Sequence, residues 1–391
     1  MKVAIIIERY DISQGGAEWL VFELASALSQ FGVEVDIVAA HGDNTAANTR
    51  ILCKTGHTKR ISLASFAKLI SHHLHQNHYD IVHSVIPLAF ADVYQPPGGS
   101  FAEAQLRNAA SYRSRFVISY KKATALLNWR RTEMLWAERK LCKDPDGPVI
   151  AALSNYVIDQ FKKRYDLGSE RLALIPNGVI TDREVNIEDA EKSRRQIYSR
   201  LALKESDKPV FFLFGANNFR LKGLNVLIEA IALLSKLETP RKPFLIVVGR
   251  GKINKYHHKA KKFNMDKTIV FLGHQPSIQN ALSMSDVAVL PTFYDPCSRF
   301  ILEALAAGKP AITTRFNGAT DFFVNNRHGR VLDCPEDVAA LAEAINYFTN
   351  TENIQKASQV IAADNLKEKI SIGRVAEQLI STYKSILKKR R

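Results

Sequence analysis

The stretch DVAVLPTFYDPCSRFILEALAAGKPAITT, residues 286–314, decides the fold class. It begins with a short apolar run at 286–290, passes through a loop into a helical stretch that starts just after Ser298, and ends in a second apolar run at 310–314. Continuous apolar runs are typical of strands that are covered on both faces, as in a parallel sheet. Residues 286–314 therefore predict a strand–helix–strand unit of an α/β protein.

The same pattern extends through the rest of the chain. The apolar run at 3–7 is followed by an amphipathic stretch in which Ala17, Leu20, Val21 and Leu24 recur at helical spacing. Further strand-like runs occur at 33–38, 80–85, 149–153, 172–175, 210–214, 244–248 and 268–272. Strands and helices that alternate through both halves predict two doubly wound domains.

The best domain boundary lies at Ile175-Pro176-Asn177-Gly178, where a strand-like run ends in turn residues. The polar stretch 181–208 follows it, and a last helix is expected at about 366–388. We therefore expect an N-terminal domain at 1–178, a C-terminal domain at 179–365, and a C-terminal helical segment at 366–391 that packs back on the N-terminal domain.

Net charge, cysteine spacing and the length of the first apolar run indicate which ligands and which compartment to expect. The 391 residues are 46% hydrophobic and carry 54 basic against 39 acidic side chains, a net charge of +15 that attracts phosphates, nucleic acid or an anionic membrane. The cysteines show no metal-site or disulfide spacing; they are Cys53, Cys142, Cys297 and Cys334. The first apolar run is too short for a signal peptide or a membrane span, so we expect a cytoplasmic protein.

Two loops that follow predicted strands suit an anionic ligand. Gly15 and Gly16 precede the first helix, where glycine lets the backbone approach a ligand and the helix start attracts phosphate; such a turn also needs glycine for its own dihedrals. Residues 215–223 place Arg220 and Lys222 after the strand 210–214, and two cations there suit a diphosphate. A solvated basic loop is the alternative.

The strongest signal is the pair Asp295 and Glu303, which spans the corner between a strand, a loop and a helix. Carboxylates at such a corner can accept the paired hydroxyls of a sugar and a ribose, while the helix start faces a phosphate. Acidic residues near a helix start are also common as caps, which is the alternative explanation.

Together these motifs resemble the retaining GT-B glycosyltransferases of family four. The resemblance rests on Gly-Gly after the first strand, Arg-x-Lys-Gly after the central strand, the acidic corner followed by Gly-x-Pro, the turn at 176–178, and the loop Val248-Gly249-Arg250-Gly251. Within the family the chain is most similar to the lipopolysaccharide core heptose glucosyltransferases. The resemblance implies two Rossmann-like domains that face a central cleft.

The resemblance also implies roles for single residues. Lys222, supported by Arg220, would hold the donor diphosphate and stabilise its departure, and Gly16 would let the backbone touch a phosphate. Glu303 would bind the ribose and Asp295 the transferred sugar. Gly249 and Ser298, at the family's two loop positions beside the nucleotide, complete the expected donor site.

The resemblance further implies the reaction and its ligands. A hexose, by default glucose, would move with retention of configuration from a nucleotide diphosphate sugar, by default a UDP-sugar, to a glycan or lipid-linked acceptor such as the lipopolysaccharide core. The nucleotide sugar is a co-substrate, and we expect neither a cofactor nor a metal ion.

Three positions depart from the family pattern. Asp295 stands where glutamate is usual, Ser298 where glycine is usual, and Gly98-Gly99 where an acidic residue of the acceptor side is expected. Asp92 and His83 are the nearest candidates for that missing group, and we predict Asp92 as the catalytic-side carboxylate.

Residues 105–143 hold ten basic and two acidic side chains, a local balance of +8, with aromatic residues interleaved. Basic residues beside interfacial aromatics are typical of segments that bind an anionic bilayer, so we expect a peripheral enzyme on the inner face of the cell membrane. The alternative is a solvated helical face whose aromatics lie in the core. Nucleic acid is the rival ligand, but the chain shows no recognised nucleic-acid module.

Two other functions remain compatible with the sequence. A nucleotide-sugar epimerase would share the two-domain architecture but would not need the Arg-x-Lys-Gly motif. A catalytically degenerate membrane scaffold that binds sugar nucleotides would explain the three departures. Release of nucleotide diphosphate distinguishes a transferase from both.

Overall fold

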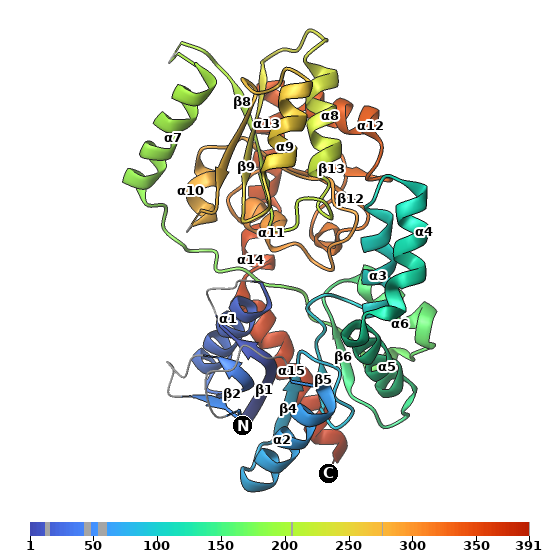
Figure 1. Cartoon of the computed structure of the whole chain (residues 1–391). Helices are drawn as coiled ribbons and strands as arrows, with labels where there is room; N and C mark the ends of the chain where they lie inside the picture. The colour runs from blue at the N-terminus through green and yellow to red at the C-terminus, as the bar shows by residue number, and fades with distance from the viewer. Residues whose placement is uncertain (12–15, 43–47, 54–60, 205, 276, 391) are drawn as a thin grey trace. The chain divides into compact units, whose positions relative to one another are not determined.

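The computed structural model describes residues 1–11, 16–42, 48–53, 61–204, 206–275 and 277–390. The chain forms two compact units, each with its own parallel sheet (Figure 1). Unit 1 comprises Met1–Ala109, Ser114–Gly178 and Ile372–Arg391, and unit 2 comprises Ala110–Arg113 and Val179–Ser371. Among the described residues the chain therefore enters unit 2 briefly at Ala110–Arg113, passes into it again after Gly178 and returns to unit 1 at Ile372.

The sheet of unit 1 has seven parallel strands in the order β3-β2-β1-β4-β5-β6-β7. The strands are β1 Lys2–Tyr10, β2 Glu34–Gly42, β3 Thr49–Ile51, β4 Ile81–Ser84, β5 Val93–Tyr94, β6 Val149–Ala152 and β7 Leu172–Leu174. Burial explains the central place of β1, because Val3, Ala4, Ile5 and Ile6 have no exposed surface. A strand buried on both faces needs apolar residues at consecutive positions, which is the pattern of its sequence.

Helices cover this sheet. They are α1 Ala17–Gln30, α2 Leu63–Gln76, α3 Phe101–Ala110, α4 Arg115–Ala123, α5 Trp129–Lys143, α6 Asn155–Tyr165 and α15 Ile372–Arg390. The C-terminal α15 shares a hydrophobic core with α1 and β1, to which it contributes Val375, Leu379 and Tyr383. The Tyr383 hydroxyl lies 2.5 Å from Nδ1 of His83 on β4, which ties α15 to the sheet.

The sheet of unit 2 has six parallel strands in the order β10-β9-β8-β11-β12-β13. The strands are β8 Val210–Gly215, β9 Pro243–Val248, β10 Ile269–Gly273, β11 Val287–Leu290, β12 Ala311–Thr314 and β13 Gly329–Leu332. The helices are α7 Ile187–Leu201, α8 Leu224–Leu234, α9 Asn254–Lys262, α10 Ile278–Ser283, α11 Arg299–Ala306, α12 Val338–Tyr347, α13 Thr351–Ala363 and α14 Leu366–Lys369. These strands and α8 are almost wholly buried.

The structure differs from the sequence prediction where elements are short or polar. Strand β5 has only two residues, and β3 and β13 each contain an arginine, so none of the three shows a continuous apolar run. The polar stretch after the domain boundary contains the helix α7. The helix expected at 366–388 is two helices, α14 and α15, which are separated by Ile370 and Ser371. At this break the backbone N–H of Val179 donates to the carbonyl of Ile370, and Val179 forms a β-bridge with Ser371.

Candidate active site

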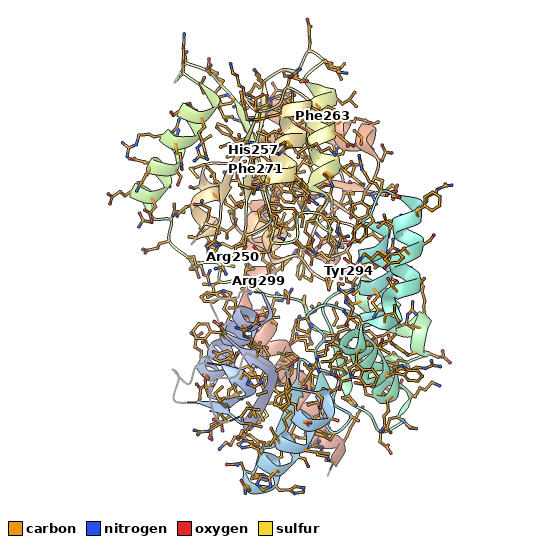
Figure 2. All side chains as sticks on the ribbon, viewed as in Figure 1. Arg250, His257, Phe263, Phe271, Tyr294 and Arg299 are labelled. Atoms are coloured by element: carbon orange, nitrogen blue, oxygen red, sulfur yellow. The ribbon has the colours of Figure 1, made fainter. Side chains whose placement is uncertain are left out.

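The candidate site of unit 2 lies where the strand order of its sheet reverses, between β8 and β11. Open α/β sheets bind ligands outside the carboxyl ends of their strands at such a switch point. The loops 215–223 and 291–298 follow these two strands. Arg250, Tyr294 and Arg299 gather at this end of the unit, away from Phe263 (Figure 2). The predicted motifs at 215–223, 248–251 and 291–298 therefore lie at the same carboxyl edge of the sheet.

Lys222 and Asp295, predicted from separate motifs, form an ion pair. The Lys222 Nζ atom donates to Asp295 Oδ2 at 2.6 Å and to the carbonyl of Tyr294 at 2.9 Å. The backbone N–H of Phe293 also donates to the carbonyl of Leu221 at 2.9 Å, so the two loops are joined by their main chains. This arrangement holds the ammonium group in one place before any ligand arrives.

The loop that carries Asp295 is fixed by the loop after β12. The backbone N–H of Asp295 donates to the carbonyl of Phe316, and its carbonyl accepts from the N–H of Gly318, each at 2.9 Å. Ser298 is the N-cap of α11, and its own N–H donates to Oδ1 of the buried Asn317 at 3.1 Å. Serine at this position caps the helix through its hydroxyl, which glycine cannot do.

Glu303 lies on α11, with its carboxylate 3.7 Å from the guanidinium of Arg299. Its side chain is only 13% exposed. It lines a cavity of about 190 Å³ together with Phe300 of the same helix and with residues at or just after the ends of β8, β9 and β10; these include Gly215, Asn217, Gly249, His274 and Gln275. Glu303 and Gly249 thus line the same cavity. The ion pair between Lys222 and Asp295 is not part of that lining.

Gly249 allows the close approach of two loops at this cavity. Its φ is +133°, and a Cβ atom added there would lie 1.7 Å from the carbonyl oxygen of Ala216. The next residue, Arg250, donates its backbone N–H to Oδ1 of Asn217 at 3.1 Å, and its guanidinium lies 3.0 Å from the His274 ring. Glycine is therefore required by the fold as well as suited to a ligand that approaches the backbone.

In unit 1, Gly16 is the N-cap of α1 with φ 71° and ψ −113°, a conformation that favours glycine. Its place after β1 corresponds to the switch point of that sheet, between β1 and β4. Gly15 lies outside the described residues. The backbone requirement accounts for Gly16 with or without a bound phosphate.

Asp92 and His83 both make contacts that hold unit 1 together. Asp92 Oδ2 accepts from the N–H of Val82 at 2.8 Å, and the carboxylate pairs with Arg390 of α15. These contacts lie at the amino ends of β4 and β5, opposite the edge where α/β sheets bind ligands. Complete burial lowers the pKa of His83 to about 4, so its ring is neutral at physiological pH.

Glu138, one of the two acidic residues of the basic segment 105–143, is buried and lies next to the residues that follow Gly98-Gly99. Its carboxylate accepts hydrogen bonds from the Tyr165 hydroxyl at 2.8 Å, from Ser100 Oγ at 3.1 Å and from the N–H of Phe101. Burial raises its pKa to about 7. Glu138 thereby holds the first residues of α3 immediately after the two glycines.

An aromatic–basic surface lies on α4, α5 and the turn between them. We define it by its exposed aromatic, leucine and basic side chains, which are Arg115, Phe116, Tyr120, Lys121, Leu127, Trp129, Arg131, Trp136, Arg139, Lys140 and Lys143. Phe116 is 89% exposed and Trp129 80% exposed. The alternative in which these aromatics lie in the core is therefore wrong for this surface. Within the described part of the chain, no helix is long and apolar enough to cross a bilayer.

Arg130 does not belong to this surface. Its guanidinium pairs with Glu8 and with Glu133, the latter at 2.8 Å, and also donates to the carbonyl of Ile61 at 3.3 Å. Not all ten bases of 105–143 therefore lie on the aromatic–basic surface. Arg130 connects α5 to the sheet, and Arg107 pairs with Glu103 in the same helix.

Comparison with known proteins identifies the family. The model of Glycosyltransferase Family 4 matches residues 14–183, and the model of glycosyl transferases group 1 matches residues 197–365. The chain belongs to the glycosyltransferases. Its Lys222, Asp295 and Glu303 lie in the part matched by the second model.

Two relatives and two solved structures illustrate the similarity. The chain is 22% identical over 348 residues to the lipopolysaccharide glucosyltransferase WaaG of Escherichia coli K12, covering 88% of each chain. It is 27% identical to the putative teichuronic acid biosynthesis glycosyltransferase TuaC of Bacillus subtilis, covering 61% of this chain and 57% of TuaC.

Among solved structures, WaaG matches with a TM-score of 0.74 at 19% identity and covers 96% of this chain and 98% of its own. Anabaena HepE in complex with UDP-glucose matches with a TM-score of 0.68 at 16% identity, covering 98% of this chain and 100% of the HepE chain. These matches show that the fold is GT-B, as the sequence predicted.

Proposed function

We propose that the protein is a retaining hexosyltransferase that moves glucose from UDP-glucose to a glycan or lipid-linked acceptor of the lipopolysaccharide core type. The observation that carries the proposal is that the Lys222–Asp295 ion pair and the cavity lined by Glu303 both lie at the carboxyl edge of the unit 2 sheet. Uridine and glucose are chosen because the HepE structure contains UDP-glucose and WaaG is named a glucosyltransferase.

In this proposal the donor binds with its nucleoside in the cavity beside Gly249. Glu303 accepts the ribose hydroxyls, since a carboxylate can accept two hydroxyl groups at once. Lys222 and Arg220 neutralise the diphosphate, and Asp295 accepts hydroxyls of the hexose. Because Lys222 is held by Asp295 at 2.6 Å, one contact orients both the group that binds phosphate and the group that binds sugar.

The chemical step breaks the bond between the anomeric carbon and the diphosphate oxygen. Negative charge grows on the departing diphosphate, where preorganised cations stabilise the transition state more than the ground state. The acceptor hydroxyl attacks the anomeric carbon from the face that the diphosphate leaves, and its proton passes to a phosphate oxygen. No protein base is required in this route, so the proposal does not depend on Asp92. It also needs no metal ion, because the cations are side chains.

We also propose that the aromatic–basic surface binds the anionic inner face of the cell membrane. Exposed aromatics beside lysine and arginine are typical of proteins that bind at a membrane interface, and each base near such a surface contributes about 1 kcal/mol. Trp129 and Trp136 lie seven residues apart on α5 and are 80% and 63% exposed. A position at the membrane would bring the enzyme to a lipid-linked acceptor.

Turnover of nucleotide sugars tests the proposed function. The purified protein would be incubated with UDP-glucose, UDP-galactose, UDP-N-acetylglucosamine and GDP-mannose, with and without a heptose acceptor, while nucleotide diphosphate release is followed. We expect release to be fastest with UDP-glucose and to increase with the acceptor, and NMR should show an α-linked product. An epimerised nucleotide sugar without release would indicate an epimerase. No product of either kind would indicate a binding scaffold.

A further inference from the structure

The segment Ala110–Arg113 belongs to unit 2, although the residues before and after it belong to unit 1. Two of its side chains contact Arg220. Ser111 is buried, and its Oγ accepts a hydrogen bond from Nη1 of Arg220. The Tyr112 ring lies under the guanidinium, with 3.8 Å between the guanidinium carbon and the ring centroid. Arg220 is therefore held by a hydrogen bond at its edge and an aromatic ring at its face.

A third residue of the segment anchors it to a rigid element. Arg113 donates through both terminal nitrogens to the carboxylate of Glu229, the Nη1–Oε1 contact measuring 2.5 Å. Glu229 lies on α8, which is mostly buried and begins directly after Gly223 at the end of the Arg220 loop. Lys259 also donates to Glu229 Oε1 at 2.5 Å. The bidentate pair thus fixes the segment against the helix that follows the loop it contacts.

This arrangement suits an arginine that must meet a diphosphate. A free arginine side chain loses about 2 kcal/mol of rotamer entropy when it becomes fixed, and prior fixation avoids that loss on binding. Stacking uses the face of a guanidinium, whereas its N–H donors lie in its plane, where a phosphate oxygen can meet them. Burial, and then the positive charge of Arg220, lower the pKa of Lys255 on α9.

We propose that Tyr112 and Ser111 are positioning residues that hold the Arg220 guanidinium toward the donor diphosphate, and that Arg113 anchors them through Glu229. The proposal rests on the proposed function, in which Arg220 binds the diphosphate. Neither residue touches the substrate, so their effect on the reaction passes entirely through Arg220.

Substitution of Tyr112 tests the proposal. A cation–π contact of about 0.5–2 kcal/mol corresponds to a fall in kcat of about twofold to thirtyfold for Tyr112→Ala. Tyr112→Phe keeps the ring face and should restore kcat to within about twofold of the wild type. Because the negative charge that Arg220 meets is greatest as the diphosphate departs, its misplacement should lower kcat more than it raises donor KM. The matched control is Tyr347→Ala, which removes another arginine–tyrosine stack of unit 2, that of Arg330 at 4.0 Å, and should leave kcat unchanged.

A double-mutant cycle separates positioning from a general loss of structure. Residues that act through a common partner are non-additive, so Tyr112→Ala should lower kcat no further in the Arg220→Ala background. Additive losses, or failure of Tyr112→Phe to restore kcat, would overturn the positioning role while the wild type remained an active transferase. A wild type that releases no nucleotide diphosphate from any donor would instead reject the proposed function, and the positioning role with it.

Discussion

Replacement of Lys222 by alanine should have two separable effects, one on catalysis and one on stability. The substitution removes the Nζ atom that donates to Asp295 Oδ2 at 2.6 Å and to the carbonyl of Tyr294 at 2.9 Å. It thereby deletes the cation proposed to stabilise the departing diphosphate. It also leaves the Asp295 carboxylate, which is 14% exposed, without the lysine that neutralises it.

The two effects differ in size. A preorganised electrostatic group at a developing charge contributes about 3–4 kcal/mol, so kcat should fall about 10²–10³-fold. Loss of one partner costs little at an exposed ion pair and about 3–5 kcal/mol at a buried one. The side chains of Lys222 and Asp295 are 19% and 14% exposed. We therefore expect a loss of about 1–3 kcal/mol in the free energy of unfolding.

The assay measures kcat by nucleotide diphosphate release and stability by urea unfolding. The double variant Lys222→Ala/Asp295→Asn removes the uncompensated carboxylate charge and should regain most of the lost stability without regaining turnover. Lys261→Ala, which removes an exposed lysine of α9, serves as the matched control for charge and should change neither quantity.

Two results would refute this reasoning. A folded Lys222→Ala variant with the kcat of the wild type would show that the diphosphate binds elsewhere. Recovery of both stability and turnover in the double variant would show that Lys222 only neutralises Asp295 and has no direct part in the reaction.

Three further predictions follow from other parts of the structure. Glu303→Gln should weaken donor binding about tenfold or more, because one of two acceptor oxygens is lost; unchanged affinity by calorimetry would place the ribose elsewhere. Trp129→Ser/Trp136→Ser should abolish cosedimentation with phosphatidylglycerol vesicles. The control Ile187→Ser, which removes a residue of α7 that is 72% exposed, should not. If the wild type bound neutral vesicles as well as anionic ones, the proposed membrane surface would be wrong. Burial raises the pKa of Glu138 from 4.5 to about 7, so the folded state keeps a proton that the unfolded state loses. Stability relative to Glu138→Gln should then be greatest below pH 4.5 and fall by up to about 3 kcal/mol as the pH rises through 7; parallel stability curves would contradict this.

The sequence alone determined the fold class and most of the donor-site candidates. Runs such as 210–214 and 286–290 are apolar at every position because their strands are covered on both faces, and this requirement is visible without any tertiary information. Lys222, Asp295 and Glu303 could be selected as candidates because ligand groups of α/β proteins follow the carboxyl ends of such strands. Local pattern was sufficient for these residues, since each follows directly from its own strand or helix.

Which of these groups meet, and which charges are exposed, follows from packing in three dimensions. Lys222 pairs with Asp295 across 73 positions and Arg220 bonds to Ser111 across 109 positions. The first contact depends on the strand order of the unit 2 sheet and the second on where the segment Ala110–Arg113 packs, and no local pattern records either. The basic segment shows the same limit: Arg130 is paired inside unit 1 while Trp129 beside it is 80% exposed. Neighbours in sequence differ in this way because a helix turns them to different sides, and what lies on each side is set by packing.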